Sequence, residues 1–318
     1  MARCPNRGAT LYPGRVPDLL DHNFLFVVGK GGVGKTTVSA AAGLAAARKG
    51  KRVLIAMANA TERLSQLLGV DPIGDQVVRV APNLDAVNMS PKAALEEYGM
   101  MILKVKSLYK AIFENRFVEA FLRGTPGIEA WAMLGKAYFH AAGHGPGSKG
   151  AYDLVLLDAP ATGHGLDMIR VPHVILDVAP PGLLRREAER ALSLFQDPKR
   201  AGALLVTLAE DMPVNESIEL HTALVQDLKI HVPEIVVNQL LPKLFADDTR
   251  ETIAGIEATL AADSPLQTLA RAGRLRTMRE ATQADSLKTL SAALDVPRRN
   301  LPRLFDPAFG RAPLQTPR

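Results

Sequence analysis

A glycine-rich run at residues 29–37, Gly-Lys-Gly-Gly-Val-Gly-Lys-Thr-Thr, constrains this chain more than any other stretch. The apolar run 24–28 precedes it and the alanine-rich run 38–48 follows it, so the pattern predicts a buried strand, a tight turn and the start of a helix. The run fits G-x-x-x-x-G-K-[ST], in which glycines let backbone N–H groups wrap a polyphosphate. The motif and its flanks together indicate a nucleotide phosphate site rather than an ordinary tight turn.

The loop supplies a set of candidate nucleotide-binding residues: Gly29, Lys30, Gly31, Gly32, Val33, Gly34, Lys35, Thr36 and Thr37. A helix that begins near Lys35 directs its positive dipole end at the phosphates. Lys35 has the length to reach the β- and γ-phosphates, and the Thr36 hydroxyl can ligate Mg²⁺. We therefore expect ATP or ADP with Mg²⁺ as the ligands.

Strand-like and helical patterns alternate along the chain. Apolar runs predict further strands, each separated from the next by helical sequence, at residues 53–57, 84–87, 152–157, 204–208 and 235–237. A mostly parallel, twisted sheet with helices on both faces is the α/β architecture that this order favours. We expect one P-loop domain over residues 1–318, with a helical insertion subdomain at 91–145 and a flexible tail at 307–318. Residues 249–294 are expected to be mostly helical, with a last edge element from about 295.

The composition excludes several classes of site. Cys4 is the single cysteine, so we expect neither an internal disulfide nor a zinc site built on a cysteine pair. No apolar run is as long as a membrane span and the first residues lack the apolar core of a signal peptide, which predicts a cytoplasmic protein. The net charge is +5, and late arginines favour a solvated helix face over a nucleic-acid surface, so no nucleic acid is expected as a partner.

Asp158 ends a predicted buried strand. In open α/β sheets ligands gather at the carboxyl ends of strands, so Asp158 is placed to orient a Mg²⁺-bound water. The alternative is an aspartate that only caps the following turn. The sequence after it, Asp-Ala-Pro-Ala-Thr-Gly-His-Gly-Leu at 158–166, favours the magnesium role.

Lys30, Asp158 and their surroundings resemble a known family. Lys30 in the second loop position resembles the deviant Walker A motif of the SIMIBI class of P-loop NTPases. Residues 158–166 resemble switch II (D-T-A-P-T-G-H-T-L) of the arsenical pump-driving and tail-anchored-protein targeting ATPases, except that proline comes one position earlier. Residues 126–129 are similar to the family's P-G-I-D-E stretch, residues 213–216 lie where the family has P-E, and residues 234–241 match its I-I-V-N-Q-L-L segment. The resemblance covers most of the chain.

The resemblance implies several roles. Lys30 would reach across a dimer interface to the partner's nucleotide, which implies a dimer closed by ATP, and Thr37 would contact the α-phosphate. Asn238 would bind adenine, for which an amide offers a donor and an acceptor side by side; the alternative is an asparagine that turns a strand end. Pro297 lies where the family's adenine-flanking loop is expected. Glycines at 163 and 165 would let switch II change conformation when the γ-phosphate leaves.

Asn59 departs from the family pattern. The family carries D-P-A-H after the second strand, and its aspartate positions the attacking water; here Asn59 takes that place. Asparagine can hold a water but cannot accept its proton, and Glu62 is a candidate substitute. Phosphoryl transfer depends mainly on positioning and charge neutralisation, so the pattern is compatible with a slow or partner-dependent ATPase. A pseudo-ATPase that pairs with an active paralogue is the alternative.

The resemblance and the composition of the insertion also predict which partners the protein binds. We expect a homodimer, or a heterodimer with a paralogue, and a hydrophobic helical client or membrane-protein partner at the insertion. The insertion is rich in methionine and aromatic residues, which suit a client surface, although core packing of its own helices explains the same pattern. With no cysteine set for metalloid, activation by arsenite is not expected. A membrane- or DNA-positioning ATPase is a further rival, which would need a terminal amphipathic helix or a basic face.

Overall fold

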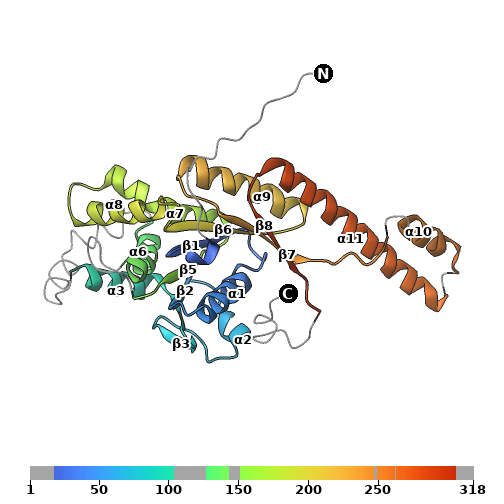
Figure 1. Cartoon of the computed structure of the whole chain (residues 1–318), viewed down its shortest axis with the longest axis horizontal. Helices are drawn as coiled ribbons and strands as arrows, with labels where there is room; N and C mark the ends of the chain where they lie inside the picture. The colour runs from blue at the N-terminus through green and yellow to red at the C-terminus, as the bar shows by residue number, and fades with distance from the viewer. Residues whose placement is uncertain (1–17, 104–126, 143–150, 247–248, 262, 306–318) are drawn as a thin grey trace, which may run out of the picture.

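Eight strands form one sheet in the part of the chain that the computed structural model describes, residues 18–103, 127–142, 151–246, 249–261 and 263–305 (Figure 1). Their spatial order is β3-β4-β2-β5-β1-β6-β7-β8. The strands are β1 (Phe24–Val28), β2 (Val53–Ala58), β3 (Val78–Ala81), β4 (Leu84–Met89), β5 (Leu154–Asp158), β6 (Ala201–Leu208), β7 (Glu234–Leu240) and β8 (Arg298–Pro302). All neighbours are parallel except the edge strand β3, which is antiparallel to β4.

Helices connect the strands and cover both faces of the sheet. They are α1 (Lys35–Arg48), α2 (Leu64–Leu68), α3 (Pro91–Leu103), α6 (Ile128–Ala142), α7 (Thr162–Val178), α8 (Leu183–Phe195), α9 (Asp211–Thr222), α10 (Thr249–Thr259) and α11 (Pro265–Ala293), with short helical turns at Leu19–Asp21 and Ala223–Asp227. The α/β architecture predicted from the sequence is therefore confirmed. The short, half-exposed strand β3 carries no strong pattern and was not predicted.

The central strand β1 shows how the two faces are formed. All five of its residues are buried, and their side chains alternate between the faces. Phe24 and Phe26 belong to the core beneath α6, α7 and α8, where both rings contact Phe195 of α8 at centroid distances of 5.0 Å. Leu25 belongs to the core beneath α1 and α2. In Figure 1 these two sets of helices lie on opposite sides of the sheet.

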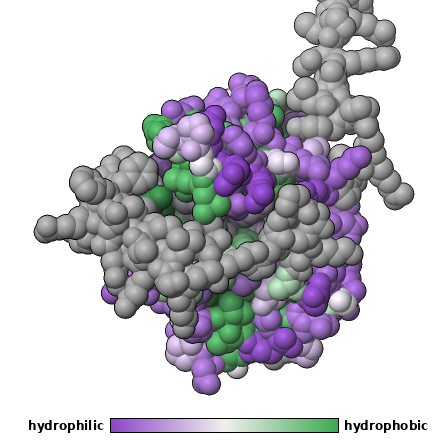
Figure 2. Space-filling model, turned by 90° about the vertical axis from the view of Figure 1, so that its left-hand side faces the viewer, coloured by the Kyte–Doolittle hydropathy of each residue, from purple (hydrophilic) through white to green (hydrophobic). Residues whose placement is uncertain are grey.

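The predicted helical insertion contains α3 and α6, while residues 104–126 and 143–145 of it lie outside the described residues. Trp131 and Leu134 of α6 are fully buried, and the indole of Trp131 meets Tyr98 of α3 edge to face at 5.8 Å. Since α6 packs directly over β2 and β5, these residues are core residues rather than client surface. Figure 2 views the end of the molecule where α3, α6 and α8 lie, and apolar residues are visible at only a few places among polar ones. The predicted tail at 307–318 also lies outside the described residues.

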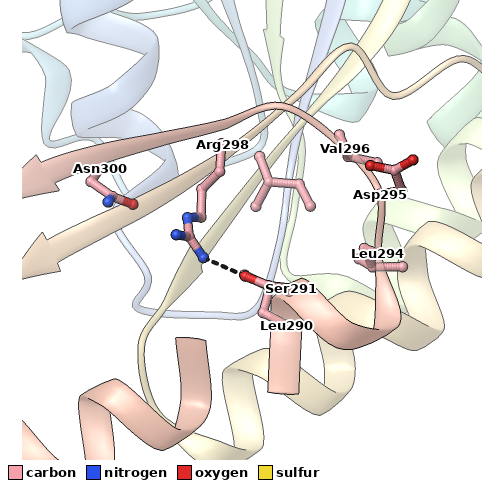
Figure 3. A pocket seen from close by; sticks show the side chains of 8 residues that line it. Leu290, Ser291, Leu294, Asp295, Val296, Arg298 and Asn300 are labelled. Atoms are coloured by element: carbon pink, nitrogen blue, oxygen red, sulfur yellow. Dashed lines mark hydrogen bonds between the residues drawn. The ribbon is translucent and has the colours of Figure 1, made fainter. Parts of the chain in front are cut away.

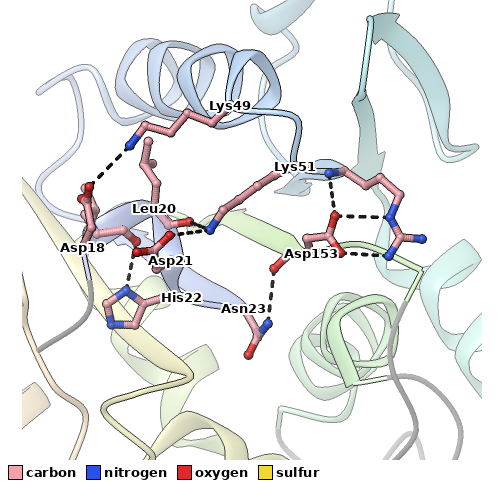
Figure 4. A network of polar contacts seen from close by, with 10 residues as sticks. Asp18, Leu20, Asp21, His22, Asn23, Lys49, Lys51 and Asp153 are labelled. Atoms are coloured by element: carbon pink, nitrogen blue, oxygen red, sulfur yellow. Dashed lines mark hydrogen bonds and ion pairs between the residues drawn. The ribbon is translucent and has the colours of Figure 1, made fainter.

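The amino ends of the strands carry a polar network (Figure 4). Lys51 donates to the backbone carbonyl of Leu20 and, at 2.8 Å, to Asp21 Oδ1, while Arg52 pairs with Asp153 at 2.9 Å. These contacts hold the segment before β1 against the end of α1 and the start of β2.

None of the helices in the described ranges combines the length and apolar character needed to cross a bilayer. The parallel strands end at the opposite edge of the sheet, where the loop between β1 and α1 lies.

Candidate active site

The phosphate-binding loop connects β1 to α1, as the sequence predicts. A Cβ atom at Gly29 would lie 2.1 Å from the carbonyl oxygen of Val206, and one at Gly34 would lie 2.3 Å from Asn238 Nδ2. Gly34 also has φ +93°, in the left-handed region, and α1 begins at the next residue without a side-chain cap. The first N–H groups of α1 therefore point into the loop, the arrangement that binds phosphate.

Lys35 lies across its own loop. Its Nζ donates hydrogen bonds to the carbonyl oxygens of Gly29 at 3.0 Å and Lys30 at 3.2 Å. Burial lowers the pKa of Lys35, and the nearby carboxylate of Asp158 opposes that change. The ammonium thus lies within the concave loop, close to where the motif predicts phosphate.

Asp158 and Thr36 meet directly. The Thr36 hydroxyl donates to Asp158 Oδ2 at 2.6 Å, and Asp158 Oδ1 is buried with no hydrogen-bond partner among the described residues. Burial raises the pKa of Asp158 to about 6, although the Thr36 hydrogen bond and the Lys35 charge act in the opposite direction. A buried, unpaired carboxylate oxygen beside a threonine hydroxyl fits a hydrated Mg²⁺, which prefers oxygen ligands and retains several waters.

Lys30 forms an ion pair within its own chain. Its Nζ lies 2.6 Å from Glu216 Oε1 of α9, and the two side chains are about one-third exposed. The sequence comparison marked the segment 213–216 but assigned no role to Glu216. The structure adds Glu216 to the site as the residue that pairs with Lys30 within the same chain.

Asn59 follows β2 at the same edge of the sheet. Met57 of β2 lies beside Asp158 in the β2–β5 register, so Asn59 comes two residues beyond that point. Asn59 is exposed and has φ +49°, a left-handed conformation that asparagine tolerates better than most residues. Its place near the end of β5 is compatible with the predicted role of holding a water.

Glu62 is engaged elsewhere. Its two carboxylate oxygens accept hydrogen bonds from the backbone N–H of Ser65 at 2.8 Å and from the Ser65 hydroxyl at 2.5 Å. These bonds satisfy donors at the start of α2. In this conformation both carboxylate oxygens of Glu62 bind Ser65 at the start of α2.

Asn238, near the end of β7, contacts the phosphate loop. Its Nδ2 donates to the carbonyl oxygen of Val33 at 2.9 Å, and its Oδ1 accepts from the backbone N–H of Gln239 at 2.9 Å. The second bond fits the simpler prediction, an asparagine that turns a strand end. The first bond ties the loop to β7, so the side chain lies beside the phosphate loop, and its predicted role in binding adenine stays a prediction.

Pro297 does not lie with the other candidate residues. Its carbonyl oxygen accepts from Ile235 N–H at the start of β7, at the amino edge of the sheet. A cavity of about 340 Å³ lies there between α11, β7 and β8, lined in part by Arg298, whose Nη1 donates to Ser291 Oγ at 2.8 Å (Figure 3). The assignment of Pro297 to the adenine site is corrected: the parallel register places Pro302, not Pro297, beside Leu240 at the carboxyl edge.

The segment predicted to be switch II, residues 158–166, runs from the end of β5 into the start of α7. Gly163 and Gly165 both lie in the first turn of this helix, and a Cβ atom at Gly165 would lie 2.7 Å from the carbonyl oxygen of Pro160. A Cβ atom built on Gly31 would lie 3.5 Å from Ala161 Cβ, so switch II and the phosphate loop face each other. Asn59, His164 and Met133 are among the residues that line a cavity of about 730 Å³ between the two switches and the starts of α3 and α6.

Within the described ranges, no group of three or more histidine, cysteine, aspartate or glutamate side chains is arranged to hold a metal. The site instead combines one hydroxyl, one carboxylate and an array of N–H groups around a loop. This combination binds a metal only together with phosphate oxygens, as in P-loop proteins.

Comparison with known proteins identifies the family of this chain. The family model described as anion-transporting ATPase matches residues 22–179 and 184–258. The ATPase BagA of Mycobacterium tuberculosis is 26% identical over 314 residues, covering 93% of this chain and 90% of that protein. The arsenical pump-driving ATPase of Escherichia coli is 26% identical over 75% of this chain and 44% of its own length. The ATPase GET3 of Zygosaccharomyces rouxii is 25% identical over 72% of this chain and 75% of its own length. Because the family model matches well over half of its residues, the chain belongs to the anion-transporting ATPase family.

Proposed function

We propose that this protein is a Mg·ATP-dependent ATPase that works as a dimeric switch. The observation that carries the proposal is the cluster formed by Lys35, Thr36 and Asp158, in which a buried carboxylate oxygen has no partner among the described residues. Leaving such an oxygen unpaired costs free energy, so an unpaired atom beside a phosphate-binding motif points to a ligand that completes it.

Each residue has a defined task in this proposal. The loop N–H groups and Lys35 bind the phosphates and neutralise their charge. Thr36 would ligate Mg²⁺ and Asp158 would orient its water ligands; when bound, the metal neutralises charge on the β- and γ-phosphate oxygens. Asn59 holds the attacking water by a hydrogen bond, and Asn238 binds the base.

Lys30 links the site to a second subunit. Bound to Glu216, it neutralises a carboxylate of its own chain. In a closed dimer it would leave Glu216 and reach the partner's nucleotide. Nucleotide turnover would then alternate the switches, and the α3–α6 region next to them, between two arrangements that a client or partner protein can sense.

Steady-state phosphate release with Mg·ATP tests the proposal, with Lys35→Ala and Asn59→Asp measured in parallel. Wild-type activity that Lys35→Ala abolishes is the expected result, and Asn59→Asp should increase the rate because a carboxylate can accept a proton from water. Wild-type protein that neither binds nor hydrolyses ATP would contradict the proposal.

Two observations favour testing a second function. Asn59 lacks a carboxylate, and Glu62 uses both of its oxygens to cap α2. A nucleotide-binding subunit that does not hydrolyse ATP and pairs with an active paralogue is consistent with both. Tight ATP binding with no phosphate release in the wild type, and activity gained in Asn59→Asp, would favour this function over the first.

A further inference from the structure

Asn88, at the carboxyl end of β4, holds the segment after β2 through both ends of its side-chain amide. The backbone N–H of Ala60 donates to Asn88 Oδ1 at 3.2 Å, and Asn88 Nδ2 donates to the carbonyl oxygen of Ala60 at 3.0 Å. The side chain therefore makes the pair of bonds that a peptide unit makes between strands. Asparagine is uncommon in strands, and in β4 these two hydrogen bonds give its side chain a structural role.

The backbone conformation of Asn59 explains why the side chain of Asn88, and not the backbone of β4, bonds to Ala60. The backbone N–H of Asn59 still donates to the carbonyl oxygen of Met89 at 2.9 Å, which continues the β2–β4 pairing. Asn59 then turns into the left-handed region at φ +49°, and a strand cannot continue through this conformation. Beyond Asn59 the backbone of β4 no longer pairs with the segment that follows β2. The side-chain amide of Asn88 forms the hydrogen bonds to Ala60 instead.

Asn88 also lies next to the start of α3. Successive side chains of a strand point to opposite faces, so Asn88 and Met89 face different layers. Ala60 packs against the core beneath α1 and α2, whereas Met89 is buried in the core that also contains Tyr98 of α3. Ser90 comes immediately before α3, and its carbonyl oxygen accepts from the N–H of Ala94 at 2.9 Å. Only two residues separate Asn88 from α3, which begins at Pro91.

We propose that Asn88 is a positioning residue that sets Asn59 at the γ-phosphate and couples switch I to α3. This inference rests on the proposed function, because it assumes that Asn59 holds the attacking water. Asn88 touches neither nucleotide nor water in this scheme; it acts through Ala60. A nucleotide-dependent movement of Asn59 is transmitted through the Asn88–Ala60 bonds to the end of β4, and from there to α3.

The test compares Asn88→Ala, which removes both bonds, with Asn88→Asp, which keeps the acceptor and removes the donor. Tyr152→Phe is the matched control, because it removes the 2.9 Å bond from the Tyr152 hydroxyl to Asp85 Oδ2 on the same strand without contacting switch I. Phosphate release gives kcat and KM, fluorescent-nucleotide titration gives the Kd for ATP, and hydrogen–deuterium exchange measures the protection of residues 91–103 on adding Mg·ATPγS.

We expect Asn88→Ala to lower kcat about tenfold, within the range that misplaced reacting groups cost, while the Kd for ATP changes less than about twofold. Asn88→Asp should fall between Asn88→Ala and the wild type. The nucleotide-dependent protection of residues 91–103 should be lost in Asn88→Ala and retained in Tyr152→Phe. A structural role alone would lower stability without separating kcat from Kd.

Four results would overturn the inference. The first is an Asn88→Ala protein with wild-type kcat and wild-type protection of α3. The second is a Tyr152→Phe protein with the same defects as Asn88→Ala, which would indicate a general loss of stability. The third applies if the wild type binds ATP without hydrolysing it, when only the hydrogen–deuterium exchange measurement is informative. Nucleotide-dependent protection of residues 91–103 that is retained in Asn88→Ala would then contradict the inference. Wild-type protein that binds no Mg·ATP refutes the proposed function itself, and the role of Asn88 with it.

Discussion

At the scale of single residues, burial of the Asp158 carboxylate lowers the stability of the ligand-free protein. Asp158 is almost fully buried, and burial raises its pKa to about 6 in spite of Thr36 and Lys35. A folded-state pKa above the ordinary value means that the folded protein binds the proton more tightly than the unfolded chain does. Stability therefore falls as the pH rises from about 4 to about 6, and the full cost is present above pH 6.

Asp158→Asn should for this reason stabilise the ligand-free protein at pH 7.5. The amide keeps an acceptor for the Thr36 hydroxyl and cannot ionise. The difference between a pKa of about 6 and the ordinary aspartate value of 3.8 corresponds to about 3 kcal/mol, which is the largest gain expected. Urea unfolding without nucleotide or Mg²⁺, at pH 7.5 and at pH 4, measures it.

The gain should vanish near pH 4, where the carboxyl of the wild type is largely protonated in the folded protein and the cost of its charge is gone. Mg·ATP binding by the variant should be weakened at the same time. A variant no more stable than the wild type at pH 7.5 would contradict the burial argument.

At the scale of elements, a buried ion pair joins α3 to α6. Lys136 of α6 is only 1% exposed; its Nζ lies 2.6 Å from Glu97 Oε2 of α3 and donates to the carbonyl oxygen of Asp75 at 3.1 Å. Glu97 is 30% exposed. The two partners are therefore unequal, because only the glutamate can reach water if the pair is broken.

The difference in burial between Lys136 and Glu97 predicts which of two substitutions lowers the free energy of unfolding more. Glu97→Gln leaves a buried ammonium without its counter-charge and should cost about 2–4 kcal/mol, whereas Lys136→Met, with an apolar chain of similar length, should cost only about 1–2 kcal/mol. The amide introduced by Glu97→Gln would still accept the hydrogen bond from Gln76, so lost hydrogen bonding to Gln76 does not explain the difference. Urea unfolding at pH 7.5 gives both values, and the reverse order would contradict this dependence of the cost on burial.

At the scale of the whole molecule, the proposed dimer depends on Lys30. Its pair with Glu216 is about one-third exposed, and such pairs contribute about 0–1 kcal/mol, so a second subunit needs little free energy to release Lys30. The parallel sheet places Lys30, switch I and switch II at one edge, and this edge is the expected dimer face.

Light scattering after size exclusion, with Mg·ATPγS and with Mg·ADP, should therefore show a dimer only with the ATP analogue. Lys30→Ala should remain monomeric in both. Glu216→Gln should favour the dimer by up to about fivefold, since it removes at most about 1 kcal/mol of attraction that holds Lys30 in its own chain. A nucleotide-independent dimer, or a Lys30→Ala dimer equal to the wild type, would contradict the role given to Lys30.

The local elements of this protein could be predicted from the amino-acid sequence. Residues 24–48 specify a strand, a loop and a helix, because apolar pattern, glycine and helix-forming residues act over a few positions, and the fold class followed from their alternation. Lys35, Thr36 and Asp158 could be chosen in advance since they lie at the ends of such elements.

Features that depend on contacts between distant segments emerged only from the folded chain. The parallel register places Pro297 at the amino edge of the sheet and Pro302 at the carboxyl edge, and packing against the sheet made Trp131 a core residue. The pair of Lys30 with Glu216 and the bonds from Asn88 to Ala60 join residues 186 and 28 positions apart. No local pattern encodes such distances, because the sheet order that brings these segments together is set by the folding of the whole chain.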